Sequence, residues 1–215
     1  MPTGTGTLEK PRATRGPAPP HDGFSGEPGR GGDGALPPPA NPARIGVWLL
    51  VGGVTILFAA FTITYLSRRH AADWTVGPIP LMLWINTAVL LISSAAMEWT
   101  RASAGWDSIG EVRGALGATT ALGIAFLAGQ VIVWRQLVAA GIFLATNPHS
   151  AFFYLLTGTH ALHLVGGIGG LCYALWKVRR AVDLSQAAAV VGPVAIYWHF
   201  VDALWIYLFF ILFWL

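Results

Sequence analysis

Five long stretches of this 215-residue sequence contain at most one Asp, Glu, Lys or Arg each. They lie at about residues 45–67, 78–99, 114–138, 151–176 and 189–214. A bilayer core is about 30 Å thick, and a helix of about 20 residues crosses it. Lipid offers no hydrogen-bond partners to the backbone, so each stretch must be helical rather than extended. The sequence therefore predicts an all-α integral membrane protein, a bundle of five transmembrane helices.

The composition excludes a soluble chain. Apolar residues make up 54% of the sequence and charged residues 11%, whereas soluble proteins carry about 25% charged residues. The single cysteine, Cys172, excludes a disulfide framework and a cysteine-rich metal or iron–sulfur site. The net charge of +3 is small and the basic residues are dispersed, so nothing in the sequence indicates nucleic-acid binding.

The chain divides at about residue 44. Residues 1–43 contain 9 Gly and 10 Pro, and such a segment cannot bury enough apolar surface to offset the entropy lost on ordering. It has no apolar core followed by a small-residue cleavage site, which a secretory signal peptide needs. We therefore expect residues 1–43 to be a disordered Gly/Pro-rich cytoplasmic tail and residues 44–215 to be the five-helix membrane domain.

The placement of Lys and Arg predicts the orientation, because cytoplasmic loops are enriched in both residues. A cytoplasmic N-terminus places 10 of the 13 basic residues inside, half of them in the tail. The remaining three, Arg68, Arg69 and Arg135, then lie outside. The expected location is a bacterial plasma membrane, with the C-terminus on the periplasmic or external side.

Two pairs of polar residues interrupt the last two predicted helices. His160 and His163 are three residues apart, and His199 and Asp202 repeat that spacing, so each pair lies on one helix face. An aspartate at the centre of a membrane helix costs about 2.5–3.5 kcal/mol on insertion scales. A histidine on a neighbouring helix would offset part of that cost, so these polar residues are the candidates for a site.

Three interpretations of the four residues remain open. The favoured one is a set of interhelical polar contacts that hold the fourth and fifth predicted helices together. A metal site is less favoured, although three imidazoles and a carboxylate could supply four ligands. A proton relay is the third, and the absence of a second buried acid in this region counts against it.

Three segments together resemble a known family. Residues 152–163 read FFYLLTGTHALH, residues 197–205 read YWHFVDALW, and residues 86–94 read NTAVLLISS. These motifs are similar to those of haem–copper oxidase (cytochrome c oxidase) subunit III, and the similarity extends over residues 45–215. Five helices correspond to the short form of that family. Two motifs depart from the family pattern, because Val54 and Val133 stand where the family has glutamates.

The resemblance implies an accessory subunit of a proton-pumping terminal oxidase that reduces oxygen to water in aerobic respiration. Such a subunit binds no haem, copper or other metal itself, packs beside catalytic subunit I in a complex with subunit II, holds phospholipid and supports proton uptake. No residue of this chain is then expected to be catalytic. The candidates for lipid or subunit contacts are Trp48, Gln130, Tyr154, Trp198 and Trp205.

Related assignments stay open at this point. A partner of a nitric oxide reductase or of a quinol oxidase would share the same helices, since the electron donor binds elsewhere. A stand-alone transporter is a rival of a different class, but the sequence shows neither the broken helices nor the inverted repeats that would support it.

Overall fold

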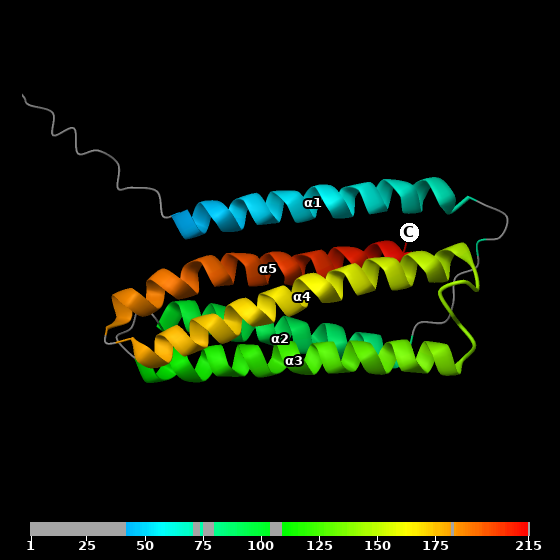
Figure 1. The fold of residues 1–215 in the computed structure, drawn as a ribbon. Helices are drawn as coiled ribbons and strands as arrows, with labels where there is room; N and C mark the ends of the chain where they lie inside the picture. Colours follow the sequence, from blue (N-terminus) through cyan, green and yellow to red (C-terminus); the bar gives the residue numbers. More distant parts are fainter. Residues whose placement is uncertain (1–41, 71–73, 75–79, 104–108, 182, 215) are drawn as a thin grey trace, which may run out of the picture. The chain divides into compact units, whose positions relative to one another are not determined.

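The computed structural model describes residues 42–70, 74, 80–103, 109–181 and 183–214, which form five long helices (Figure 1). They are α1 (Pro42–Arg68), α2 (Leu81–Ser103), α3 (Ile109–Ala139), α4 (Pro148–Arg180) and α5 (Leu184–Trp214). All five are long and apolar enough to cross a membrane. Even α2, with 23 residues, extends about 35 Å at 1.5 Å per residue. The predicted all-α membrane fold is confirmed.

The predicted tail lies almost wholly outside the described residues, which begin at Pro42. Pro42 is the first residue of α1, a position where proline is favoured because its missing N–H would have no helical partner anyway. The helix therefore starts two residues inside the segment that the composition assigned to the tail.

Consecutive helices run antiparallel, and α2, α3, α4 and α5 form a ring in which each helix packs against two others (Figure 1). Helix α1 packs against α5 and α4 from outside this ring. Much of α1 is exposed, including Leu49, Ile56 and Ile63, each about two-thirds or more exposed. Exposed aliphatic side chains on a helix of this length are what a lipid-facing surface requires.

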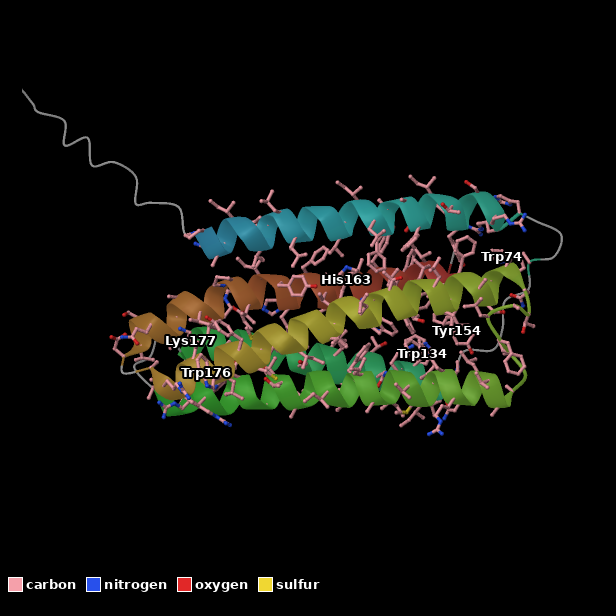
Figure 2. All side chains as sticks on the ribbon, in the orientation of Figure 1. Trp74, Trp134, Tyr154, His163, Trp176 and Lys177 are labelled. Carbon is pink, nitrogen blue, oxygen red and sulfur yellow. The ribbon has the colours of Figure 1, made fainter. Side chains whose placement is uncertain are left out.

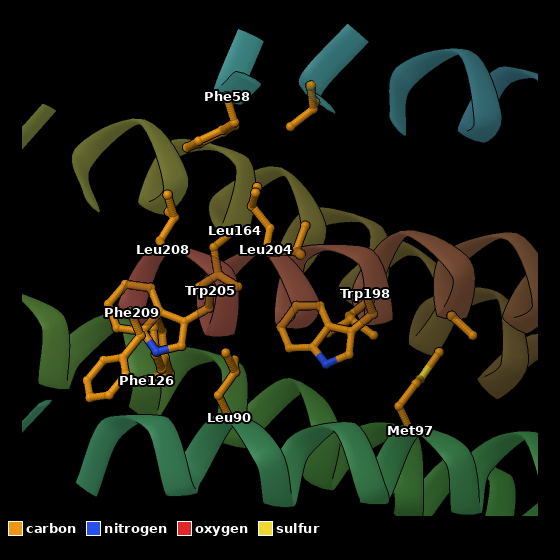
Figure 3. Packing of buried hydrophobic residues seen from close by; sticks show 14 of the residues in the cluster. Phe58, Leu90, Met97, Phe126, Leu164, Trp198, Leu204, Trp205, Leu208 and Phe209 are labelled. Carbon is orange, nitrogen blue, oxygen red and sulfur yellow. The ribbon is translucent and has the colours of Figure 1, made fainter. Parts of the chain in front are cut away.

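The core of the ring is built on two tryptophans of α5, Trp198 and Trp205, which are almost completely buried (Figure 3). Trp205 packs edge-on against Phe126 of α3, with ring centroids 4.9 Å apart. Trp198 lies against two glycines, Gly123 of α3 and Gly167 of α4. A side chain at Gly123 would lie 2.5 Å from the Trp198 ring, so this glycine gives the indole its space.

Helices α2 and α3 approach each other closely at another glycine, Gly129 of α3. The Asn86 side chain of α2 lies against Gly129 of α3 and donates a hydrogen bond to the backbone carbonyl of Phe126 at 3.1 Å. Small residues at helix contacts allow this close approach in membrane proteins. The pairing explains why the amide of Asn86 can lie inside the bundle.

The helix ends carry recognisable capping signals. Helix α3 ends in a Schellman motif, in which the N–H groups of Gly141 and Ile142 reach back to the carbonyls of Val138 and Leu137. Gly141 has a φ of 78°, a conformation that glycine adopts without strain. Helix α4 is capped at its start by Asn147, whose side chain accepts a hydrogen bond from the backbone N–H of Ser150.

We predict that Gly129→Ala destabilises the bundle by about 1–3 kcal/mol, because the added methyl group would overlap the Asn86 amide. Gly117→Ala on the same helix is the matched control, since nothing lies within 4 Å of its added carbon. Thermal unfolding of the full chain in detergent measures both variants. Equal stability of the two variants would show that the α2–α3 contact does not depend on Gly129.

Asp183 caps α5 and supplies a pH-dependent prediction. Its carboxylate accepts hydrogen bonds from the backbone N–H of Gln186 at 2.9 Å and from the Ser185 hydroxyl at 2.7 Å. The Gln186 bond above all lowers the pKa of this exposed carboxyl below its ordinary value. A lowered folded-state pKa means that the cap stabilises the helix end above the ordinary pKa, and that this is lost as pH falls through the lowered value.

Hydrogen exchange of the Gln186 amide, corrected for its intrinsic rate, should therefore lose protection at acid pH in the wild type. Asp183→Asn should keep its protection over the same range, because an amide oxygen can cap the helix without titrating. The same acid loss in both proteins would contradict the assigned cause.

Candidate functional site

The main polar contact between α2 and α5 is formed by Ser94, Glu98 and His199. Ser94 and Glu98 are four residues apart on α2, so they share one helix face. The Ser94 hydroxyl lies 2.8 Å from Nδ1 of His199, and Oε2 of Glu98 lies 3.4 Å from its Nε2. The imidazole of His199 is therefore hydrogen-bonded to α2 through Nδ1, whereas its Nε2 is near Glu98 but has no hydrogen-bond partner among the described residues.

The outer end of this contact reaches the surface of the chain. The Glu98 side chain is 60% exposed, and Arg101 donates a hydrogen bond to its Oε2 at 3.0 Å. The His199 side chain is 31% exposed. The contact thus extends from an exposed ion pair near the end of α2 into the bundle.

Asp202 lies at the inner end, three residues after His199 on α5, and is 3% exposed. Neither carboxyl oxygen has a hydrogen-bond partner with good geometry among the described residues. The next turn of α5 is tied to α2 by the indole N–H of Trp205, which donates to the Thr87 hydroxyl at 3.1 Å.

His160 on α4 is fully buried, and two aromatic rings lie next to it. Its ring lies 5.1 Å from that of Trp205 and 6.2 Å from that of Phe126. Neither ring nitrogen has a hydrogen-bond partner among the described residues. The imidazole therefore sits in a largely apolar environment.

Gln130 of α3 is a second buried polar residue, and we infer that it lies at the same level of the α3–α4 pair as His160. Trp134, one turn further along α3, donates its indole N–H to Thr157 of α4 at 3.1 Å. Helices α3 and α4 run antiparallel. Gln130, one turn before Trp134, is therefore expected to lie opposite His160, one turn after Thr157. The amide of Gln130 is also fully buried and has no hydrogen-bond partner in the described part of the chain.

His163 joins three helices. Its Nδ1 lies 2.8 Å from the Thr159 carbonyl of its own helix, and its ring packs on Phe58 of α1 at 5.7 Å. The backbone carbonyl of His163 accepts a hydrogen bond from the Tyr197 hydroxyl of α5 at 3.2 Å. Figure 2 shows His163 on the side of α4 that faces α1.

The four polar residues singled out in the sequence are thus placed differently from the pattern expected for a lock between α4 and α5. No hydrogen bond joins them to one another among the residues described. His199 contacts α2 instead, through Ser94 and Glu98. The i, i+4 spacing of Ser94 and Glu98 shows that both side chains lie on one face of α2. That spacing does not show which other helix packs against this face.

Three of the five residues considered for lipid or subunit contacts belong to the core. Gln130, Trp198 and Trp205 are 1% exposed or less, so lipid and partner subunits cannot reach them in this structure. Trp48 on α1 is 61% exposed and remains available. Tyr154 is half-buried, and its hydroxyl donates to the Ile142 carbonyl after α3 (Figure 2).

The metal interpretation finds no support in the described residues, where no group of three or more His, Cys, Asp or Glu side chains is placed to hold an ion. Val54 and Val133, at the two positions where the resemblance led us to expect glutamate, are both buried. A valine at either position fills core space without placing a charge there.

Comparisons with known proteins agree on one family. The model of the family described as cytochrome c oxidase subunit III matches residues 40–215. The chain is 32% identical over 168 residues to cytochrome c oxidase subunit 3 of Synechocystis sp., covering 76% of this chain and 71% of that protein. Identity is 34% over 169 residues with the Thermostichus vulcanus protein of that name, covering 77% and 80%. It is 27% over 189 residues with that of Bacillus subtilis, covering 80% and 89%.

Proposed function

The chain belongs to the cytochrome c oxidase subunit III family, and we propose that it is the accessory subunit III of a proton-pumping haem–copper terminal oxidase. The observation that carries the proposal is that the family model spans the whole membrane domain, from residue 40 to residue 215. Haem and copper then lie in catalytic subunit I and in subunit II, and oxygen is reduced to water there. This chain stabilises the catalytic subunit and supports its proton uptake.

The alternatives are not favoured. The three relatives compared above are all named cytochrome c oxidase subunit 3, and none carries the name of a nitric oxide reductase or quinol oxidase partner. The name supports cytochrome c as the electron donor of the complex.

We place the N-terminus in the cytoplasm and the C-terminus outside. Antiparallel packing brings the C-terminal end of α4 and the N-terminal ends of α3 and α5 to one side of the bundle (Figure 1). Lys177, Arg179 and Arg180 lie in the last turn of α4. Arg113, near the start of α3, hydrogen-bonds to carbonyls of that same turn. This concentration of basic residues supports a cytoplasmic side.

Phospholipid binding has support from two apolar grooves beside α1. A groove of about 360 Å³ between α1 and α5 is lined by Thr55, Phe58, Phe200 and Tyr207, among others. A second, of about 230 Å³, includes Val47 of α1 with Gly166 of α4 and Val194 of α5. Both grooves are lined mainly by apolar atoms, so acyl chains fit them better than polar ligands do.

A third cleft, of about 500 Å³, lies where α4 ends and α5 begins, and it suits a lipid headgroup. Trp176, Lys177, Arg180 and Gln186 line it (Figure 2 labels the first two). The Arg180 guanidinium lies 4.3 Å from the Trp176 ring centroid. Neither Lys177 nor Arg180 has an acidic partner among the described residues, so both are available to an anionic phosphate.

We expect the full chain, solubilised in mild detergent from its own membranes, to purify with a haem subunit that consumes oxygen. Oxygen and nitric oxide uptake, with haem spectra of the same preparation, measure this. Purification of a haem-free chain, or of a complex that consumes nitric oxide and not oxygen, would contradict the proposal.

The double variant Lys177→Gln/Arg180→Gln should retain about ten- to thirtyfold less anionic phospholipid than the wild type, because each cation near the surface contributes about 1 kcal/mol. Arg135→Gln, at the opposite end of the bundle, is the control and should retain the wild-type amount. Native mass spectrometry of the purified protein counts the bound lipid. An equal loss of bound phospholipid in both variants would show that the cleft is not the lipid-binding site.

A further inference from the structure

We propose that the outer surface along the contact between α2 and α5 is the docking site for one membrane-spanning helix of a partner subunit. This α2–α5 surface is made by Leu91, Ala95 and Glu98 of α2 and by His199, Ile206 and Phe210 of α5. The identity of the partner, a haem-bearing subunit, rests on the proposed function. The location of the surface rests on the geometry of this chain alone.

Helix α2 contributes a continuous exposed stripe to this surface. Its members are three or four residues apart and therefore share one helix face; they are Trp84, Ala88, Leu91, Ala95 and Glu98. The Trp84 ring lies 4.9 Å from that of Phe209, and Glu98 lies beside His199, so the stripe follows α5 closely. Fourteen residues separate Trp84 from Glu98, which is about 21 Å and enough to contact about four turns of a partner helix.

Helix α5 contributes the second side of the surface. Ile206 and Phe210 follow His199 by seven and eleven residues, so the three side chains lie on one helix face. Ile206 is 47% exposed and Phe210 is 50% exposed. The next residue of α5, Tyr207, donates its hydroxyl to Thr62 of α1 at 3.0 Å. The exposed face of α5 therefore lies between its contact with α2 and its contact with α1.

Glu98 places a carboxylate on this surface at the depth of the hydrocarbon. His199 is the midpoint of α5, fifteen residues from either end. A helix of 31 residues is about 46 Å long, so it can cross a core of about 30 Å only with its midpoint within about 8 Å of the bilayer centre. Oε2 of Glu98 lies 3.4 Å from Nε2 of His199, yet the Glu98 side chain is 60% exposed. Exposed carboxylates at such depth face protein or a water-filled cavity rather than lipid.

The exposed faces of α1 and α4 differ from this surface. The charged residues of α1 and the basic residues of α4 lie in the first or last turns of those helices, where long side chains reach the headgroups. Between those ends the two helices expose aliphatic side chains such as Ile56 and Leu162. These faces suit lipid, whereas the α2–α5 surface needs a polar partner.

The partner that fits is a helix with a hydrogen-bond donor opposite Glu98. Arg101 and His199 both approach Oε2 of Glu98, which leaves Oε1 without a partner in the described part of the chain. Ala88 and Ala95 are exposed and lie seven residues apart on the stripe, and small residues allow another helix to come close. An acyl chain offers no donor to the carboxylate, so these features favour a protein helix.

The first test is photo-crosslinking from the surface. In the full chain, produced in its own membranes, p-benzoylphenylalanine replaces Leu91, or Ile56 on α1 as the matched exposed control. We expect the Leu91 probe to link to a membrane-spanning peptide of the haem subunit, identified by mass spectrometry, and the Ile56 probe not to link to that peptide. A Leu91 probe that links only to lipid, to this chain or to a second copy of it would overturn the proposal, as would the reverse pattern.

The second test blocks the close approach. Ala95→Leu should lower the amount of haem subunit that purifies with the chain by about tenfold or more, since disturbing a central interface contact weakens binding by that factor. Ala125→Leu, at an exposed alanine of α3, is the control and should keep the wild-type ratio. Both variants should keep the wild-type unfolding temperature because both positions are exposed.

Glu98→Leu decides the question if Ala95→Leu does not fold. Removal of a carboxylate that only faces lipid would leave the ratio of haem subunit to chain unchanged. Removal of a carboxylate that binds a partner helix lowers that ratio, while the chain alone in lipid nanodiscs stays folded. Wild-type ratios in the folded variants would overturn the proposal.

Failure of the docking surface and failure of the accessory-subunit assignment give different results. A chain that purifies with haem but does not crosslink to the haem subunit from Leu91 rejects the surface alone. A wild-type chain that purifies without haem rejects the assignment. A Leu91 crosslink to an identified spanning segment of another protein, lost in Glu98→Leu, would then keep the surface with a different partner, and no such crosslink would reject both.

Discussion

Inside the bilayer a polar group can find a partner only within the protein, and this constraint shapes every contact described above. Thr62 and Thr120 return their hydroxyls to carbonyls four residues earlier in their own helices. Between helices, indole N–H groups bind threonine hydroxyls, as Trp205 binds Thr87. Each interhelical bond of this kind satisfies a polar group and also fixes the position of one helix against its neighbour.

The constraint also explains the central position of α5. This helix contacts α1, α2 and α4, and its large aromatic side chains need space that only small residues can provide. Gly123 and Gly167 leave that space for Trp198. Apolar burial gives little driving force for helix association in lipid, so fit of this kind and a few interhelical hydrogen bonds hold the ring together.

Against that background, the few buried polar groups without partners stand out. They are Gln130 on α3, His160 on α4 and Asp202 on α5, whose buried polar atoms have no hydrogen-bond partner among the described residues. Polar and ionisable residues inside membranes are costly and commonly functional.

The sequence by itself determined the fold class and the number of helices, because helix length and the scarcity of charge follow directly from the thickness and dielectric of the bilayer. The motifs around His160 and His199 were also sufficient to indicate the family, which the comparisons then established. Spacing of three or four residues showed which polar side chains share a helix face. Those inferences use properties local to one helix.

Only the tertiary structure decided which helix each face meets. His199 was expected to face α4 and contacts Ser94 and Glu98 of α2 instead. Trp198, Trp205 and Gln130 lie in the core rather than at a lipid surface. Except in α2, apolar residues are spread around the whole helix, so hydrophobic periodicity does not distinguish a face that meets lipid from one that meets another helix. That choice depends on side-chain shape and hydrogen bonding between segments far apart in the sequence, such as Trp198 with Gly123, and these act only once the helices have packed.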